Sequence, residues 1–318
     1  MRPSNCRSLG RNRRVNTSTK PGKSGEDHGL PSNTGFQETA FQKGADDPSS
    51  ARVSLAANTV GANTAGKALL ITGTDTNVGK TWVTCLIARQ LMACGLRVAA
   101  YKPVCSGAII ASTMGSPETI TGTLAGTSPA NSLVIWEDIE RLKAAIGEEW
   151  SDEIICPQRF LAPLAPPIAA KQEGRTVDFL RILSGAYQFP GADVLLIEGA
   201  GGWLSPLTEQ FTVADVAAKL RAPVLIVARA GLGTINHTLL TIESIRHRGL
   251  EIAGVVLNEP RPTDHDASTA TNAEEIERRS DVPVFGVLPH GDDPSLLRGG
   301  IPVTMDWLLL AKPLAEPS

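Results

Sequence analysis

The sequence lacks the cysteine patterns that cross-link secreted proteins or bind metal ions. Its five cysteines form no C-x-x-C pair and no cluster with histidines at the spacing of metal ligands. We therefore expect buried thiols in a reducing compartment, and a cytoplasmic location. The cysteines are Cys6, Cys85, Cys94, Cys105 and Cys156.

Long hydrophobic runs are also missing. No apolar run approaches the length that a membrane span requires. The first residues contain no apolar core of the kind found in secretory signals. We therefore expect no membrane partner and no export.

Positive charge is scarce outside the first 67 residues. Residues 1–67 contain ten Lys or Arg against five Asp or Glu, whereas the rest of the chain contains 20 against 28. An acidic body argues against nucleic acid as a partner. The basic segment is rich in Ser, Asn, Thr and Gly and shows no sustained apolar period, so we expect residues 1–67 to be a disordered tail and residues 68–318 to form one domain. A targeting role for the tail, a mis-assigned start and a plain solvated extension all stay open.

Short apolar runs alternate with amphipathic stretches from residue 68 onward. Continuous apolar strands separated by helices predict an α/β fold, with a mostly parallel sheet and helices on both faces. In such folds, catalytic groups gather at the carboxyl ends of the strands. The expected strands are residues 68–72, 97–101, 194–198, 224–228, 252–257 and 284–287, and the expected helices are 82–94, 138–146, 177–186, 213–220, 235–248 and 273–279, with a last one near 306–310 that docks on the sheet.

The sequence GTDTNVGKT at residues 73–81 joins the first strand to the first helix. In such a turn, backbone N–H groups converge on phosphates and the helix N-terminus adds partial positive charge. Lys80 is then placed to reach the outer phosphates, and the Thr81 hydroxyl to bind magnesium. The usual P-loop spacing places a glycine at the position of Thr74. In this chain the first glycine of the loop is Gly73, one residue earlier. The strand, turn and helix context still indicates a phosphate loop.

Two further strand ends carry charged side chains. Lys102 follows the second strand and precedes Pro103, which restrains the chain; a fixed charge in the cleft and an ordinary surface lysine are equally compatible with this position. Glu198 ends an otherwise apolar strand and leads into glycines, which let a ligand approach the backbone closely. Because an acid there needs a partner, Glu198 is a candidate for binding a metal directly or through water.

Four motifs, in their order and spacing, resemble those of dethiobiotin synthetases. They are the phosphate loop at 73–81, YKPVCSG at 101–107, EGAGG at 198–202 and GLGTINH at 231–237. The resemblance covers about residues 68–312. It implies a P-loop NTPase fold and a homodimeric cyclo-ligase, which closes a cyclic urea on 7,8-diaminopelargonate (7,8-diaminononanoate) with carbon dioxide, ATP and magnesium in biotin biosynthesis.

The resemblance also implies a mechanism. Carbon dioxide adds to one amine to give a carbamate, which attacks the γ-phosphate of ATP; the mixed carbamic-phosphoric anhydride then loses phosphate as the second amine closes the ring. Because two anions meet, catalysis needs clustered cations and oriented N–H donors. Lys80, Lys102 and magnesium supply that charge, and Lys102 matches the family's lysine that holds the carbamate and the phosphate it meets. Thr76 and Ser106 match positions that hydrogen-bond the carbamate or the transferring phosphate.

The expected magnesium ligands follow from the same resemblance. Magnesium takes near-octahedral oxygen coordination, partly from phosphate and water. Thr81 and Glu198 match two family ligands. The third is an aspartate before a helix, and the Trp-Glu-Asp-Ile pattern points to Asp138, with Glu137 as the fallback. Asp138 could instead simply cap that helix.

Other implied contacts come from loops. The proline-rich loop at 163–167 resembles one that lines the substrate pocket, although a rigid turn explains it nearly as well. The loop at 231–237 is implied to reach across a twofold interface, where its N–H groups and Asn236 meet the distal carboxylate of the substrate in the neighbouring subunit. The resemblance implies that the side-chain amide of Asn258 offers a hydrogen-bond donor and an acceptor to adenine. Without the resemblance, a single Asn at a strand end is a common turn former. The resemblance assigns ATP to Asn77, Val78, Gly79, Lys80, Thr81, Trp82, Asp138, Glu198, Gly199, Ala200, Gly201, Asn258, Pro289 and His290, and the substrate to Thr76, Ser106, Leu232, Gly233 and Asn236.

Competing functions are disfavoured by specific features. Partition-type ATPases carry an extra lysine early in the phosphate loop, and residues 72–77 contain none. Amidotransferase-type synthetases need a glutaminase domain, for which about 245 residues of core leave no room. A non-catalytic nucleotide-binding module is unattractive because Lys80, Thr81, Lys102 and Glu198 are all present. The role of the segment 108–134, which is longer and richer in Ser, Thr and Gly than expected, is not assigned.

Overall fold

The structure, a computed structural model, describes residues 65–112, 118–119, 132–261, 268–291 and 295–316. All of them belong to one compact unit, Ala56–Ser318. The tail expected over residues 1–67 lies outside the described residues except for its last three, and so does most of the segment 108–134. Among the described residues, no helix has both the length and the apolar character needed to cross a membrane.

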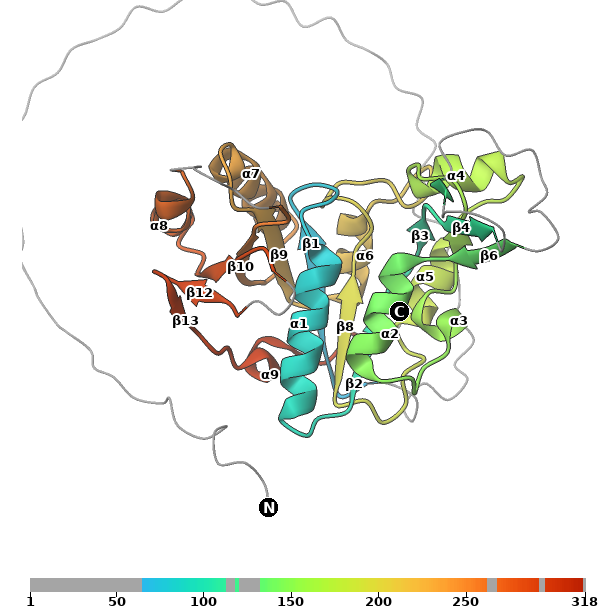
Figure 1. The fold of residues 1–318 in the computed structure, drawn as a ribbon, viewed down its shortest axis with the longest axis horizontal. Helices are drawn as coiled ribbons and strands as arrows, with labels where there is room; N and C mark the ends of the chain where they lie inside the picture. The colour runs from blue at the N-terminus through green and yellow to red at the C-terminus, as the bar shows by residue number, and fades with distance from the viewer. Residues whose placement is uncertain (1–64, 113–117, 120–131, 262–267, 292–294, 317–318) are drawn as a thin grey trace, which may run out of the picture. The chain divides into compact units, whose positions relative to one another are not determined.

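An eight-stranded sheet forms the centre of the described part of the chain (Figure 1). Its strand order is β13-β12-β11-β10-β9-β1-β8-β2. The strands from β11 to β2 all run parallel, and two short antiparallel strands extend the edge beside β11. The predicted α/β fold with a mostly parallel sheet is therefore confirmed. The strands are β1 (Lys67–Gly73), β2 (Val98–Tyr101), β8 (Val194–Glu198), β9 (Val224–Arg229), β10 (Ile252–Asn258), β11 (Val284–Leu288), β12 (Leu297–Arg298) and β13 (Ile301–Pro302).

The central strands are mostly apolar, as expected for a sheet that is covered on both faces. All residues of β8 are buried, as are those of β1 from Ala68 to Gly73. In register, Ile71 of β1 lies opposite Glu198 of β8, and Tyr101 of β2 lies opposite Ile197. The carboxyl ends of β1, β8 and β2 are thus neighbours, and the residues that follow them meet at one edge.

Helices cover the sheet on both sides. In Figure 1, α1 and α2 lie in front of the strands and α6 lies behind them. The predicted helices are present within a few residues of their expected ends, and α1 begins two residues earlier than expected. The helices that match are α1 (Lys80–Ala93), α2 (Glu137–Ile146), α5 (Phe179–Gly185), α6 (Val213–Leu220), α7 (Thr234–His247), α8 (Thr269–Ser280) and α9 (Trp307–Leu310), and those not predicted are α3 (Asp152–Ile155) and α4 (Pro166–Gln172).

Helix α9 docks on the core, as expected. The indole Nε1 of Trp307 donates a hydrogen bond of 2.6 Å to Oε1 of Gln90 in α1. The Trp307 ring also packs edge-on against Phe285 of β11, with 5.8 Å between the ring centroids. A buried tryptophan with its N–H satisfied holds the end of the described chain against the sheet.

Two small sheets were not predicted. Strand β3 (Cys105–Ser106) pairs in parallel with β7 (Arg159–Phe160). Strands β4 (Ile109–Ser112), β5 (Glu118–Thr119) and β6 (Ser132–Ile135) form an antiparallel sheet within and beside the segment 108–134. These runs are too short for their hydrophobic period to be read from sequence.

Candidate active site

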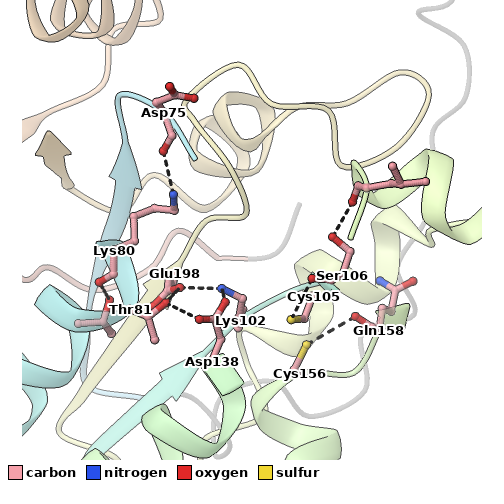
Figure 2. A network of polar contacts seen from close by, with 12 residues as sticks. Asp75, Lys80, Thr81, Lys102, Cys105, Ser106, Asp138, Cys156, Gln158 and Glu198 are labelled. Atoms are coloured by element: carbon pink, nitrogen blue, oxygen red, sulfur yellow. Dashed lines mark hydrogen bonds and ion pairs between the residues drawn. The ribbon is translucent and has the colours of Figure 1, made fainter. Parts of the chain in front are cut away.

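The phosphate loop runs from the end of β1 to the start of α1. Gly79 lies just before the helix with a φ of 92°, a left-handed conformation that glycine adopts without strain. The Lys80 side chain folds back over the loop, where its Nζ donates a hydrogen bond of 3.1 Å to the backbone oxygen of Asp75 (Figure 2). The ammonium group of Lys80 is thus held above the turn that would receive phosphates.

The structure explains the displaced glycine of this loop. A Cβ atom on Gly73 would lie 2.7 Å from the backbone oxygen of Asp75 and 3.1 Å from Nζ of Lys80. A side chain at position 73 would therefore collide with the backbone that anchors the lysine. Position 73 therefore needs a glycine, because Lys80 crosses the loop at this point.

Four polar side chains converge beside the loop, each from the end of a different element (Figure 2). Nζ of Lys102, which follows β2, lies 2.7 Å from Oε1 of Glu198 at the end of β8, and also 2.7 Å from Oδ2 of Asp138 in the first turn of α2. Oγ1 of Thr81 in α1 lies 2.7 Å from Oε1 of Glu198 and 2.9 Å from Oδ1 of Asp138. We call Thr81, Lys102, Asp138 and Glu198 the carboxylate cluster. Residues that the sequence predicted separately are thus brought together.

The two lysines of the site have opposite pKa shifts. Burial and the neighbouring charge of Lys102 lower the pKa of Lys80 to about 8. Burial opposes the charged form of Lys102 too, but the Glu198 and Asp138 carboxylates raise the pKa of Lys102 well above its ordinary value. Burial likewise opposes ionisation of Asp138, yet the charge of Lys102 and hydrogen bonds from Lys102 and Thr81 hold the pKa of Asp138 below its ordinary value. Lys102 and Asp138 are therefore a charged pair at neutral pH.

The carboxylate cluster suits a hard divalent cation. Oε2 of Glu198 is buried and has no hydrogen-bond partner. The single proton of the Thr81 hydroxyl faces two carboxylate oxygens, so one of these contacts is left without a hydrogen. Among the described residues, no cluster of three His, Cys, Asp or Glu side chains is found. The protein would thus supply two carboxylates and a hydroxyl, leaving positions for phosphate oxygens and water, as magnesium prefers.

Asp138 and its fallback Glu137 lie in different places. The Asp138 carboxylate contacts Lys102 and Thr81, whereas the Glu137 side chain is 60% exposed and pairs with Arg141 on the next turn. No side chain caps the N-terminus of α2, so Asp138 does not serve as its cap. Its position favours Asp138 over Glu137 as the third ligand, and that assignment stays a prediction.

The glycine-rich segment after β8 packs against the phosphate loop. The backbone N–H of Trp203 donates a hydrogen bond of 3.0 Å to the oxygen of Gly73. Gly201 has a φ of 73°, and a Cβ atom there would lie 3.6 Å from Oγ1 of Thr76. Gly199 has no room for a side chain, since a Cβ atom would lie 2.8 Å from Val213. Ala200 between these glycines is half-buried. The predicted nucleotide contacts at 199–201 therefore lie beside the predicted loop contacts.

The predicted substrate residues Thr76 and Ser106 are differently placed. Thr76 is exposed in the phosphate loop, and its N–H donates to Oδ1 of Asp75. Oγ of Ser106 donates a hydrogen bond of 2.6 Å to the backbone oxygen of Leu164. The proline-rich loop that contains Leu164 thus contacts the motif after β2, a contact that the sequence did not predict. Pro166 in this loop is the first residue of α4, so it is a helix start rather than a plain turn.

The predicted adenine residues lie at the end of β10 and just after β11. Nδ2 of Asn258 donates a hydrogen bond of 2.9 Å to the backbone oxygen of Val78 in the phosphate loop. Pro289 is half-buried and His290 exposed. Asn258 therefore supports the loop in addition to any contact with a base, a role that the sequence did not reveal. Trp82, also predicted to contact the nucleotide, is half-buried in the first turn of α1, and Asn77 has a φ of 57° within the loop.

The loop at 231–237 presents exposed residues. Leu232 is 87% exposed, and Gly233 and Asn236 are exposed too. Asn272 stabilises the start of this loop, because its Nδ2 donates a hydrogen bond to the backbone oxygen of Ala230. These three predicted substrate residues thus lie on the surface.

The chain was compared with known proteins. A protein-family model described as an AAA domain matches residues 67–295. An ATP-dependent dethiobiotin synthetase BioD from Anaeromyxobacter dehalogenans (strain 2CP-C) is 43% identical over 228 residues, which cover 71% of this chain and 92% of the relative. Proteins of the same name from Yersinia pestis bv. Antiqua (strain Angola) and Anoxybacillus flavithermus (strain DSM 21510 / WK1) are 36% and 37% identical, covering 71% and 70% of this chain and 86% and 92% of those relatives. The resemblance inferred from four motifs is confirmed by similarity along nearly all of the described chain, and this chain belongs to the ATP-dependent dethiobiotin synthetase family.

Proposed function

We propose that this chain is an ATP-dependent cyclo-ligase that closes the ureido ring of dethiobiotin on 7,8-diaminopelargonate, with carbon dioxide as the carbon source. The observation that carries the proposal is the convergence of Lys80 with the carboxylate cluster at the carboxyl ends of β1, β2 and β8. Membership of the dethiobiotin synthetase family supplies the reaction.

The chemistry asks the protein to bring two anions together. The carbamate formed on one substrate amine must approach the terminal phosphate of ATP. The two groups repel each other because both are negatively charged. Lys80, above the phosphate loop, balances charge on the phosphate side, and the N–H groups of the loop add oriented dipoles. Lys102 follows β2, which lies two strands from β1 in the sheet, and it would hold the carbamate. Charge neutralisation and alignment, rather than covalent catalysis, then account for the rate.

A divalent cation belongs to this proposal. Thr81, Asp138 and Glu198 would hold Mg²⁺, and the bound ion would offset charge on the phosphates. The unpartnered Oε2 of Glu198 supports this assignment.

The substrate and the base are proposed to lie on opposite sides of the phosphate loop. Thr76 and Ser106 are offered as partners of the carbamate; Ser106 would exchange its bond to Leu164 for a substrate oxygen. Asn258 is proposed to hydrogen-bond adenine. Its Nδ2 already donates one hydrogen bond to the backbone oxygen of Val78. The Oδ1 acceptor is then available to an exocyclic amine, and the second N–H of Nδ2 stays available as a donor.

We further propose a homodimer, in a reducing cytoplasm, built from the domain over residues 68–318. The dimer is supported by the exposed leucines Leu232 and Leu240, which are 87% and 57% accessible in and next to the loop at 231–237. In the dimer, Asn236 of one subunit would meet the distal carboxylate of a substrate bound to the other. The thiols of Cys85, Cys105 and Cys156 are buried and unlinked, as suits a reducing compartment.

The test is dethiobiotin formation by the purified full-length chain. ADP release should require diaminopelargonate, bicarbonate and Mg²⁺ together, and mass spectrometry should detect dethiobiotin in equal amount. DNA and lipid vesicles should not stimulate ADP release. ADP release that ignores diaminopelargonate, or that DNA stimulates, would overturn the proposal.

A further inference from the structure

Lys102 occupies the position that a cation would take in the carboxylate cluster. Its Nζ lies 2.7 Å from an oxygen of Glu198 and 2.7 Å from an oxygen of Asp138. The side chains of Lys102 and Glu198 are only 5% and 1% exposed. The same Oε1 of Glu198 also lies 2.7 Å from Thr81. The ammonium group therefore sits among the oxygens offered to a divalent cation.

Two carboxylates this close together need a positive charge between them. Without one, water would screen the repulsion between Asp138 and Glu198 only from the Asp138 side, because the Asp138 side chain is 39% exposed and that of Glu198 only 1%. The other lysine does not serve this purpose, since Lys80 donates to the backbone oxygen of Asp75. In the described part of the chain, Lys102 is the lysine that forms ion pairs with both carboxylates.

A divalent cation and Lys102 are not compatible in the same place. The ion would bring two positive charges against the two negative charges of Asp138 and Glu198, which leaves the charge of Lys102 uncompensated and repelled. Lysine has a flexible four-carbon stem, so its ammonium group can move while the backbone stays. Figure 2 shows Lys102 lying between the carboxylates and Ser106, which is one of the proposed partners of the carbamate.

We propose that Lys102 is an internal placeholder for the divalent cation, so that loading of the metal and release of Lys102 towards the substrate are a single exchange. The inference rests on the proposed metal-dependent ligase function. Its consequence is an order of events: the charge that receives the carbamate becomes available only once the metal is bound.

The first test measures binding of Mn²⁺ alone to the full-length protein, without nucleotide, by electron paramagnetic resonance of free Mn²⁺. Lys102→Met removes the charge and keeps much of the side-chain volume. Because the competing cation is gone, Mn²⁺ should bind this variant about tenfold or more tightly than the wild type. Lys80→Met is the matched control, since it removes an equal nearby charge that contacts no carboxylate, and it should tighten binding much less.

Two outcomes of this test would overturn the proposal. One is equal or weaker Mn²⁺ binding by a folded Lys102→Met variant, with folding judged by circular dichroism. The other is an equal gain in Lys80→Met, which would assign the effect to general electrostatics and not to the site that Lys102 occupies.

A second measurement needs no variant, because Lys102→Met could fail to fold without metal. Wild-type protein is acetylated briefly with acetic anhydride, with and without Mn²⁺, and Lys102 is quantified by peptide mass spectrometry against the exposed Lys219. Mn²⁺ should raise the acetylation rate of Lys102 relative to Lys219. An unchanged or lower rate would overturn the exchange. Neither measurement requires turnover. The exchange can therefore be contradicted while dethiobiotin formation is observed, and it can be supported while dethiobiotin formation is not observed.

Discussion

The Thr81 hydroxyl and the Glu198 carboxylate lie 2.7 Å apart although 117 residues separate them in the chain. One opens α1 and the other ends β8, so their contact joins the phosphate loop to the neighbouring strand. Asp138 completes the arrangement from α2, 2.9 Å from the same hydroxyl. Three elements therefore have to be in place before the site exists.

Thr81→Val should abolish most turnover without unfolding the protein. Valine keeps the volume and removes the oxygen that Glu198 and Asp138 share, so we expect kcat to fall by roughly 100-fold or more. Thr81→Ser keeps the hydroxyl and should retain most of the activity. Steady-state ADP release measures both. Near-equal rates in Thr81→Val and the wild type would show that this oxygen has no part in the reaction.

Lys102→Ala should lower both activity and stability. Turnover should fall by orders of magnitude because the charge proposed to hold the carbamate is lost. The free energy of unfolding should fall by about 3 kcal/mol, because two carboxylates lose their buried counter-ion. Urea unfolding followed by circular dichroism gives the second value. A variant with near-normal turnover would remove Lys102 from the mechanism.

Gly79→Ala should destabilise the protein. The backbone there has a φ of 92°, and a Cβ atom would lie 2.0 Å from Nδ2 of Asn258. We expect a loss of about 1–3 kcal/mol in stability from the backbone strain, with a further loss from the clash. Gly95→Ala is the matched control, because Gly95 has a φ of 79° but no atom within 4 Å of the added Cβ.

Removing Asn258 should separate these two effects. In the Gly79→Ala background, Asn258→Ala relieves the clash and should restore part of the melting temperature, even though the same change alone is destabilising through the lost bond to Val78. Differential scanning fluorimetry of the four proteins measures this non-additivity. Strictly additive losses would contradict the predicted contact.

The Cys105 thiol should resist alkylation at neutral pH. Burial raises the pKa of Cys105 to about 11, although the charge of Lys102 opposes the shift. Because the thiolate is the reactive form, iodoacetamide labelling in the folded protein should be slow at pH 7 and rise only as the pH approaches 11. In urea, Cys105 should label at an ordinary thiol rate. Peptide mass spectrometry measures the labelling of Cys105. Equal labelling in the folded and the denatured protein at pH 8 would contradict the burial of this thiol.

Leu240→Glu should dissociate the proposed dimer. A charge at this exposed leucine of α7 would be buried without a partner if the face pairs with a second copy. Leu309→Glu is the control, since Leu309 is 73% exposed on α9, away from the loop at 231–237. Sedimentation velocity should show a monomer only for Leu240→Glu. Identical sedimentation of the two variants would contradict a dimer through α7.

Part of the site could be predicted from sequence because its residues occupy recognisable local positions. Lys80 and Thr81 follow a glycine turn, and Glu198 and Lys102 follow buried strands, where catalytic groups gather in parallel sheets. The support of the phosphate loop by Asn258 could not be predicted, because a contact across 180 residues depends on which strands are neighbours. The small sheets around Ser106 escaped notice since strands of two to four residues have no measurable period.

The sequence by itself determined the α/β class, the order of strands and helices along the chain, and the motifs that identify the family, because these depend on local hydrophobic period and on short runs of residues. Only the tertiary structure decided that β1 lies beside β8 and β8 beside β2, and hence that Lys102 pairs with Glu198. It also favoured Asp138 over Glu137 as the third metal ligand. These two carboxylates are adjacent in sequence, but Asp138 contacts Lys102 whereas Glu137 pairs with Arg141. Long-range pairing is set by packing of the whole core, and a side chain's charge acquires its role from the groups that this packing brings within about 3 Å.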